Sequence, residues 1–432
     1  MGSDGNEEKY TLKCLECEEE FVDHYNLGCE NGHNSLLRTE YKKKQLEVRD
    51  LPGMWRFIDW LPVMSSSSSD SSPVTFRSEG LGEELGLSKL YITFSGYYPE
   101  KGANIKTCSF KELEAVPTFQ RAHERARGKI LVVASAGNTS RGFSQISPTI
   151  DTPVITVVPA DYINKTMWTT KEAGEVTLVA VDGDYTDAIK VGGTIGGLDG
   201  MIPEGGVKNV ARRDGMGVVM LDSVTCMKRL PNHYFQAVGS GAGAIGSFEM
   251  AKRAMRDGRF GNVLPQMHLA QNKPFTPMSN AWNAGRGDIV VEEDMPDSKE
   301  SIEKIYASVL STRNPPYAIK GGVYDILRRS KGSMYMVDNA EAKEAEDLFE
   351  ELEGVDLDPA ASVAIGALIQ ATNKGELGKD DYILLNVTGG GYKRIREDYS
   401  LHRIEPDFVV NSTTALEEIE GELRECLKQK TK

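Results

Sequence analysis

The stretch Ile130–Ser140 reads ILVVASAGNTS and decides the fold class. Its first five residues form a short apolar run, which is typical of a strand buried on both faces. The loop that follows consists of Ser135, Ala136, Gly137, Asn138 and Thr139. Small residues in such a loop let backbone N–H groups converge on an anion where the next helix begins. An ordinary turn capped by Asn138 is the alternative. A buried strand that leads into this kind of loop indicates a parallel sheet.

The same pattern recurs along the chain. We expect further strands at Val154–Val158, Val176–Val181, Tyr234–Val238, Val263–Leu269 and Ile383–Val387. Helical patterns lie at Phe110–Arg127, Gly243–Arg256, Lys299–Ser311, Ala340–Leu352 and Pro359–Thr372. This alternation predicts an α/β fold with mainly parallel sheets. A charged amphipathic helix at Ala415–Lys428 is expected to pack rather than to act.

Length, composition and charge exclude several classes of protein. The chain has 432 residues, of which 40% are hydrophobic, and this predicts two large lobes with a small appendage. A net charge of −14 argues against nucleic-acid and anionic-membrane binding. No apolar run reaches the ~18 residues of a transmembrane helix, and MGSDGNEEKY is too polar for a secretory signal. We therefore expect a cytoplasmic protein. The serine-rich stretch between Met64 and Pro73 is expected to be a mobile loop.

Three of the six cysteines lie close together near the N-terminus. Cys14-x-x-Cys17 and Cys29-x-x-x-His33 form two ligand pairs, and their sulfur and imidazole atoms suit a tetrahedral zinc ion. His24 is an alternative to His33, and a hairpin with unmetallated thiols is an alternative to the metal site. Because four protein ligands leave no open coordination position, this segment would have a structural role.

The expected helix Phe110–Arg127 has a lysine in its first turn, in the sequence Ser109-Phe110-Lys111-Glu112. The positive end of a helix dipole disfavours a cation there. A neutral amine is the form that adds to an aldehyde, so Lys111 is a candidate for covalent binding of a carbonyl group. A solvated surface lysine is the alternative, and Lys106 is a rival for the same role.

Two glycine-rich loops follow other expected strands. The first consists of Gly239, Ser240, Gly241, Ala242 and Gly243, and it allows close approach of the backbone to a phosphate. A dinucleotide-binding pattern that includes Gly246 is discounted, because no acidic residue follows at about 20 residues. The second is Thr388-Gly389-Gly390-Gly391, whose hydroxyl could bond a ring nitrogen. Either loop could also be a turn without a ligand.

The order of these motifs identifies a family. The chain has the lysine first, then the Asn138 loop, the Gly239–Gly243 loop and the Thr388 loop. In this order, and in the motifs Ser-Phe-Lys, Ser-x-Gly-Asn-Thr and Thr-Gly-x-Gly, it resembles the fold type II (β-family) pyridoxal-phosphate enzymes, and threonine synthase in particular, from about Pro73 to Asp407. The resemblance implies a two-lobed fold like that of tryptophan synthase β. We expect a zinc-ribbon-like segment at 1–40, a large cofactor domain at 41–110 and 221–432, and a small α/β domain at 111–220.

The resemblance also implies roles for individual residues. Lys111 would hold pyridoxal 5′-phosphate as a Schiff base and act as acid and base. Asn138 would bond the phenolic oxygen of the cofactor, Gly239–Gly243 its phosphate, and Thr388 its ring nitrogen. The loop Ser135–Thr139 would receive the substrate carboxylate.

The chain departs from threonine synthase at two places. Lys-Asp-Arg-Gly of that family has become Lys111-Glu112-Leu113-Glu114, and the phosphate-binding Asn-Ser-Val-Asn-Pro segment reads Asp222-Ser223-Val224-Thr225-Cys226. Asp222 argues against an unchanged phosphate pocket. Ser223, Lys228 and Arg229 could still bind a substrate anion.

The chain is similar to the archaeal cysteate synthase family through FSGYYPEKGANIKTCSFKELEA, ASAGNTSRGF, GSGAGAIG and NVTGGGYKR. This similarity implies that sulfite replaces the phosphate group of O-phospho-L-serine, giving L-cysteate for coenzyme M synthesis in methanogens. Cations proposed to bind both anions are Lys106, Arg141, Lys228 and Arg229. The family usually self-associates, so a homo-oligomer is implied. Alternatives are threonine synthase acting on O-phosphohomoserine, a non-catalytic protein of the same fold, and a nucleotide-dependent oxidoreductase.

Overall fold

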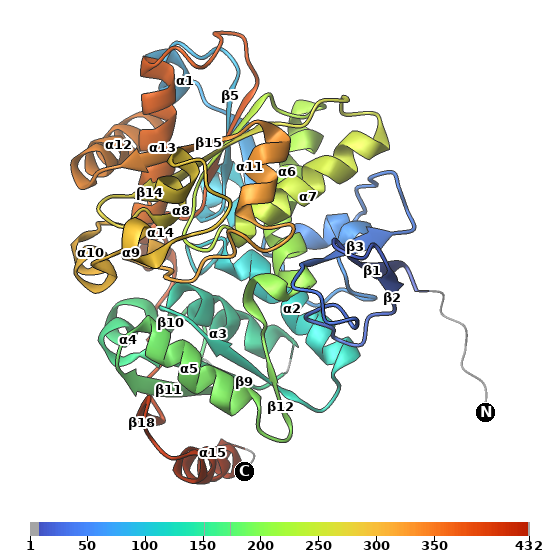
Figure 1. Cartoon of the computed structure of the whole chain (residues 1–432), viewed down its shortest axis with the longest axis vertical. Helices are drawn as coiled ribbons and strands as arrows, with labels where there is room; N and C mark the ends of the chain where they lie inside the picture. Colours follow the sequence, from blue (N-terminus) through green and yellow to red (C-terminus); the bar gives the residue numbers. More distant parts are fainter. Residues whose placement is uncertain (1–7, 151, 173, 431–432) are drawn as a thin grey trace.

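The computed structural model describes residues 8–150, 152–172 and 174–430, and its two large sheets form two lobes (Figure 1). The larger sheet has six strands in the order β15-β14-β13-β16-β5-β4, and only its edge pair β4–β5 is antiparallel. Its strands are β4 (Val74–Arg77), β5 (Leu90–Phe94), β13 (His233–Ala237), β14 (Gln266–Asn272), β15 (Ser333–Val337) and β16 (Ile383–Val387).

Helices cover both faces of this sheet. The apolar α13 (Pro359–Asn373) packs against β13, β14 and β16, and α12 (Asn339–Glu353) packs on its outer side. On the other side, α6 (Val210–Met227) packs against β4 and β5. The helices α7 (Ala242–Asp257) and α11 (Val323–Ser330) pack against β14. Every residue of β13 and β16 is buried, as expected for central strands that are covered on both faces.

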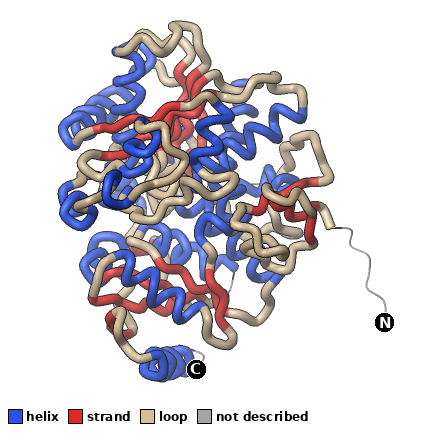
Figure 2. Tube along the Cα trace, in the orientation of Figure 1, coloured by secondary structure: helices blue, strands red, loops and turns tan. Residues whose placement is uncertain are grey.

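The smaller sheet is parallel throughout and has the order β12-β8-β9-β11-β18. Its strands are β8 (Ile130–Ala134), β9 (Val154–Pro159), β11 (Val176–Asp182), β12 (Met201–Pro203) and β18 (Phe408–Asn411). Both α3 (Asn138–Ile150) and α5 (Tyr185–Gly196) pack on β8 and β9. Between the lobes, α2 (Lys111–Arg125) packs on α3 and α6. The tube in Figure 2 shows the strands of the two lobes with helices around them. The helix α15 (Leu416–Lys430) packs on α5.

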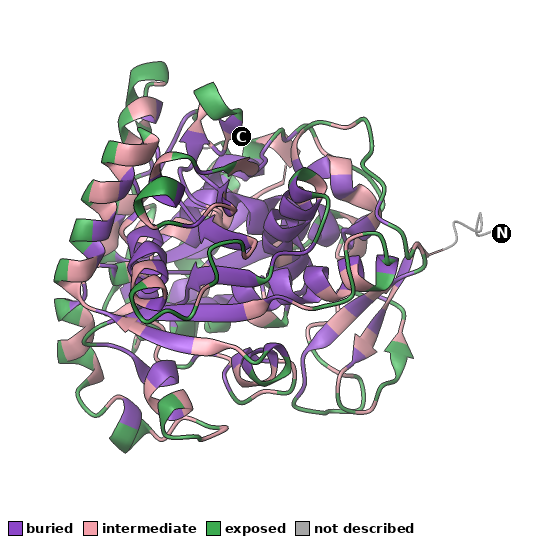
Figure 3. Ribbon diagram, turned by 90° about the horizontal axis from the view of Figure 1, so that it is seen from above, coloured by how far each residue is buried: buried purple, intermediate pink, exposed green. Residues whose placement is uncertain are grey.

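Shorter elements complete the chain. They are α1 (Gly80–Glu84), α4 (Ala160–Thr166), α8 (Pro277–Asn283), α9 (Val291–Asp294), α10 (Ser298–Lys304), α14 (Tyr392–Asp398), the strand pairs β6 (Tyr97–Tyr98) with β7 (Ala103–Asn104) and β10 (Trp168–Thr169) with β17 (His402–Arg403), and 3₁₀ turns that include Gly53–Trp60. Figure 3 shows that buried residues concentrate in the sheets and in the helices next to them.

A small N-terminal module lies beside the two lobes. Its three-stranded antiparallel sheet has the order β2-β1-β3, formed by β1 (Tyr10–Cys14), β2 (Glu20–Phe21) and β3 (Leu37–Tyr41). The buried Asp23 carboxylate accepts two bonds from the Arg121 guanidinium of α2, at 2.8 and 2.6 Å. The module is therefore fixed to the helix that carries the candidate lysine.

The structure confirms the α/β fold class and corrects several expectations. The strand expected at Val263–Leu269 begins three residues later, at Gln266. The helix expected at Lys299–Ser311 ends at Lys304, and a short 3₁₀ turn follows at Ser308–Leu310. The serine-rich stretch is not a freely exposed loop, because Ser69, Ser71 and Ser72 are buried and the Ser71 hydroxyl bonds Glu112.

We keep the expected domain limits as a proposal, except at the C-terminus, where the strand pairing requires a change. The residues of β18 pair with β11 in the smaller sheet, and α15 packs on the same lobe. The C-terminal part of 221–432 thus lies with the small lobe. Within the described ranges, none of the helices is long and apolar enough to cross a membrane. The N-terminal sequence MGSDGNEEKY, whose polarity argues against a secretory signal, lies mostly outside the described residues.

Candidate active site

One large cavity lies where the carboxyl ends of strands from both sheets meet, which is where open α/β sheets bind ligands. Its volume is about 860 Å³. The loops after β8, β12, β13 and β16 all contribute to its wall, as does the start of α2. The cavity therefore brings together the four motifs expected from the sequence: Lys111, the loop Ser135–Thr139, the loop Gly239–Gly243 and Thr388.

Lys111 is the first residue of α2 and its side chain is only 20% exposed. The Nζ atom lies 3.1 Å from Glu114 Oε2 and 4.8 Å from the centre of the Phe110 ring. Burial lowers the pKa of the Lys111 amine, and the nearby Arg212 guanidinium lowers it further, against the opposing effect of Glu114. The surroundings thus favour the neutral amine that attacks a carbonyl carbon.

The loop after β8 is shaped by its own hydrogen bonds. Ser135 Oγ accepts bonds from the Gly137 and Ser140 N–H groups, both at 3.0 Å. Gly137 has a φ of 126°, a left-handed conformation that favours glycine. Asn138 Nδ2 donates to Asp358 Oδ2 at 3.4 Å, which orients the amide at the cavity wall.

The loop after β13 leaves the start of α7 open to a ligand. Gly241 has a φ of 79°, and a Cβ atom there would lie 2.4 Å from Val323 Cγ2. The Ala242 N–H donates to Ser240 Oγ at 3.4 Å, and because the N-cap residue Gly241 has no side chain, the other N–H groups of the first turn can bind an anion. Across the cavity, buried Thr388 follows β16, and its backbone carbonyl accepts a bond from Phe110 N–H.

These groups fit pyridoxal phosphate. A neutral amine matches the aldehyde, an uncapped helix start matches the phosphate, and the Asn138 amide and Thr388 hydroxyl are donors for the ring oxygen and nitrogen. The volume is in the range of small-molecule sites. The residues expected to hold the cofactor therefore lie together in this cavity, and their individual roles stay a prediction.

The cations expected to bind the substrate anions are placed elsewhere. Lys106 pairs with Asp70 at 3.5 Å, and the Arg141 guanidinium stacks on Trp168 at 4.6 Å. Neither residue lines the cavity. The expectation that they bind the anions is therefore not supported.

The segment at the end of α6 also lies away from the cavity. Asp222 pairs with Arg56 at 2.7 Å, and Ser223 Oγ bonds Val219 O within the helix. Lys228 ends the helix, and Arg229 stacks over Tyr382 at 4.1 Å. Their position contradicts the expectation that Ser223, Lys228 and Arg229 bind substrate, because the opposite end of α6 faces the cavity.

The cations that do line the cavity are Lys208, Arg212 and Arg313. Arg212, in the first turn of α6, pairs with Glu204 at 2.7 Å and lies 3.1 Å from Glu114. Sequence reasoning missed this group because β12 spans only Met201–Pro203 and gives no apolar run. The available signal was the basic sequence Gly-Gly-Val-Lys-Asn-Val-Ala-Arg-Arg that follows Glu204.

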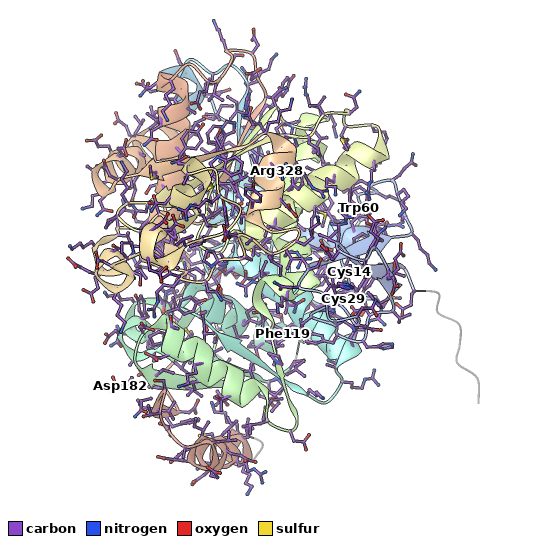
Figure 4. All side chains as sticks on the ribbon, viewed as in Figure 1. Cys14, Cys29, Trp60, Phe119, Asp182 and Arg328 are labelled. Carbon is purple, nitrogen blue, oxygen red and sulfur yellow. The ribbon has the colours of Figure 1, made fainter. Side chains whose placement is uncertain are left out.

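The N-terminal module contains a second candidate site. The ligand atoms of Cys14, Cys17, Cys29 and His33 all lie within 4.8 Å of one another, and Figure 4 shows Cys14 and Cys29 close together. Two sulfurs on a tetrahedral zinc with bonds of ~2.3 Å would be about 3.8 Å apart, and the Cys17 and Cys29 Sγ atoms are 3.8 Å apart. These residues could hold a metal ion, whereas His24 is not part of the cluster.

Comparison with known sequences finds a matching family model and similar proteins that share one name. Residues 76–389 match the family model described as "Pyridoxal-phosphate dependent enzyme". A cysteate synthase of Methanoculleus marisnigri is 51% identical over 98% of this chain and 97% of its own length. A cysteate synthase of Methanosarcina acetivorans is also 51% identical, over 95% of this chain and 99% of its own length.

Solved structures share the fold at low sequence identity. Maize serine racemase superposes with a TM-score of 0.56 at 14% identity, covering 76% of this chain and 91% of that protein. The threonine deaminase of T.th. gives a TM-score of 0.51 at 16% identity, covering 73% of this chain and 91% of that protein. These likenesses agree with the two-lobed α/β architecture.

Proposed function

The chain belongs to the pyridoxal-phosphate dependent enzyme family and, within it, to the cysteate synthases, and on this premise we propose that it converts O-phospho-L-serine and sulfite into L-cysteate and phosphate. The proposal includes the place in coenzyme M synthesis that the sequence resemblance implies. It also includes the individual roles of the cavity residues.

One observation supports the assignment of these two substrates. A buried lysine amine shares its cavity with three cationic side chains, Lys208, Arg212 and Arg313, although the whole chain has a net charge of −14. Phosphoserine and sulfite are both anions, and charge-assisted hydrogen bonds from arginine and lysine are the strongest that side chains offer to such groups. One cationic region can hold the phosphate first and the sulfite afterwards.

Each motif that lines the cavity has a proposed task in this reaction. The N–H groups at the start of α7 would hold the phosphate of the cofactor, and Asn138 and Thr388 would hold its ring. Bound pyridoxal phosphate would supply an electron sink for the charge left at the substrate α-carbon. The backbone N–H groups of the loop Ser135–Thr139 would bind the substrate carboxylate.

The proposed task of Lys111 is proton transfer at the α-carbon. Its amine, neutral because of burial, would take the α-proton before the phosphate leaves and return it after sulfite has added. Glu114, 3.1 Å from the same nitrogen, keeps the side chain directed along the cavity wall.

The decisive experiment is a substrate comparison with purified, reconstituted protein. We expect cysteate from O-phospho-L-serine only when sulfite is present, and no threonine from O-phosphohomoserine. Chromatography of the amino-acid products and a phosphate-release assay follow both reactions. Threonine formation without cysteate formation would overturn the proposal and favour threonine synthase.

A further inference from the structure

Glu204 is a buried carboxyl group in the cavity wall with one oxygen left free. It follows β12 at the edge of the smaller sheet and is 6% exposed. Its Oε2 atom accepts bonds from Arg212 Nη1 at 2.7 Å and from Gly206 N–H at 2.9 Å. Its Oε1 atom is also buried and bonds no partner among the described residues. A fixed carboxyl group with an unpaired buried oxygen beside a cavity needs an explanation.

Glu204 and Glu114 share a single guanidinium. Arg212 lies against both carboxyl groups, with Nη1 2.7 Å from Glu204 and Nε 3.1 Å from Glu114. One positive charge compensates one of these two buried carboxylates, and burial of the second charge is unfavourable. The Lys111 amine lies 3.1 Å from Glu114, but burial lowers its pKa and disfavours the charged form that could compensate the second carboxylate.

The groups around Glu204 favour its protonated form. Burial raises the pKa of Glu204, and the charge of Glu114 raises it further, while Arg212 and the Gly206 N–H group act in the opposite direction. Tyr185 and Tyr25 also face the site, and burial raises the pKa of both phenols, so they remain neutral. A dianionic phosphate ester bound beside Glu204 would favour the protonated acid still more.

We propose that Glu204 is a catalytic acid that gives its Oε1 proton to the phosphate group as it leaves the substrate β-carbon. This inference rests on the proposed function. When Lys111 takes the α-proton, the electron pair of that C–H bond becomes the double bond between the α- and β-carbons. The C–O bond breaks with its electron pair on oxygen. Without a proton the product would be the phosphate trianion, whereas transfer from Glu204 gives the hydrogen phosphate dianion and a Glu204 carboxylate.

The second half of the reaction restores the acid. Hydrogen sulfite entering the same region gives its proton to the Glu204 carboxylate and becomes the sulfite dianion. The sulfur lone pair then forms the bond to the β-carbon, and the electron pair of the double bond takes the α-proton back from Lys111. All protons and electron pairs are accounted for, and Glu204 and Lys111 end as they began.

A leaving group that needs no proton tests this role. Chloride leaves as an ion, so β-chloro-L-alanine and sulfite give cysteate without an acid. With Glu204→Gln we expect the rate with phosphoserine to fall by about 10²–10⁴-fold, while the rate with β-chloro-L-alanine changes less than about threefold. An equal loss with both substrates, or no loss with phosphoserine, would overturn the proposal.

Glu249→Gln is the matched control. Glu249 is also buried and lies 3.4 Å from the neighbouring Arg213, but it does not line the cavity. We expect it to affect the two substrates equally. If the wild-type enzyme makes no cysteate from phosphoserine, the proposed function itself fails, which is distinct from failure of the Glu204 variant.

The wild-type pH profile tests the role without any substitution, should Glu204→Gln not fold. The phosphoserine rate should fall at high pH as Glu204 loses its proton. The β-chloro-L-alanine rate should lack that decline. Identical alkaline limbs for both substrates would overturn the proposal.

Discussion

At the scale of single residues, the position of Lys111 combines two effects that oppose a charged amine. It begins α2, where the dipole disfavours a cation, and its side chain is largely buried. Sequence alone left Lys106 as a rival. The structure separates the two lysines, because Lys111 lines the cavity and Lys106 pairs with Asp70 outside it.

Replacement of Lys111 by alanine should abolish covalent binding of pyridoxal phosphate. We expect the visible absorption band of the reconstituted protein to disappear and cysteate formation to fall at least about 10²-fold. Lys106→Ala is the control and should keep both the band and the activity. Persistence of the band in Lys111→Ala would show that another amine holds the cofactor.

A pair of buried histidines predicts how stability depends on pH. His233 Nδ1 and His268 Nε2 are 2.9 Å apart in the larger sheet, and His268 Nδ1 lies 2.9 Å from the Tyr335 hydroxyl. Burial lowers the pKa of His233, and burial together with His233 lowers the pKa of His268 to about 3. Both rings are therefore neutral in the folded protein at neutral pH.

These two histidines bind protons less readily in the folded protein than in the unfolded chain. An unfolded histidine binds a proton below about pH 6.5, so the stability from His268 is complete above that pH and is lost as the pH falls toward 3. In this window His268 changes the free energy of unfolding by about 1.4 kcal/mol per pH unit. Urea unfolding of His268→Gln between pH 7 and pH 4 should show a shallower pH slope than the wild type.

At the scale of elements, the sequence predicted strands in which most residues are buried. The bounds of β8 and β16 agree with the apolar runs, because these two strands are covered on both faces mainly by apolar residues. The strands β1 and β3 alternate between buried and half-buried residues and include charged side chains, so no apolar run marks them. The helix α3 contains Gly142 and Pro148, which are poor helix formers, and its form depends on tertiary packing.

Site residues could be predicted from the sequence where they belong to one contiguous motif. They could not be predicted where the packing of distant segments brings them together. Lys111 and Gly239–Gly243 each belong to a contiguous motif, and the structure places them in one cavity. Glu204 and Arg313 come from short or irregular segments whose neighbours are set by the tertiary fold. Ser71 is similar, because its burial depends on a contact with Glu112, which is distant in the sequence.

The N-terminal module connects the candidate zinc site to the cavity. Leu27 lies against Gly205, where a Cβ atom would be 2.5 Å from the Leu27 side chain, and Arg213 Nη2 bonds the Leu37 carbonyl of β3. Gly205 and Arg213 flank the segment that carries Arg212. Loss of order in the N-terminal module should therefore also disturb Arg212 and the cavity wall around it.

Loss of the metal should loosen this module and reduce activity. We expect one zinc per chain by elemental analysis, and none above background in Cys14→Ser, because a small segment with little core of its own depends on its metal. Limited proteolysis should then cleave within residues 8–46, and cysteate formation should fall. Cys226→Ser, at an exposed cysteine outside the module, is the control and should keep zinc, protease resistance and activity.

At the scale of the whole molecule, the chain crosses between the two lobes more than once. It leaves the small lobe after β12, builds the remainder of the large lobe, and returns through β17 to β18 at the edge of the smaller sheet. The lobes also meet at the cavity, where Arg313 pairs with Asp184 at 2.6 Å. A linear division of the sequence could not predict this return, because β18 is a very short strand and pairs with β11, which lies far earlier in the sequence.

The return of the chain makes the C-terminal helix part of the small-lobe core. Leu423 is 1% exposed and packs with Val410 and with Ile195 of α5 in one apolar cluster. Leu423→Ala should lower the free energy of unfolding by about 2–4 kcal/mol, because it leaves a cavity in a packed core. Leu416→Ala, in the same helix at a residue that is 44% exposed, should change it by less than about 0.5 kcal/mol. Thermal and urea unfolding of the two variants compares the positions directly. Equal effects would mean that α15 is not packed on the small lobe in solution, and that the C-terminal residues do not belong to it.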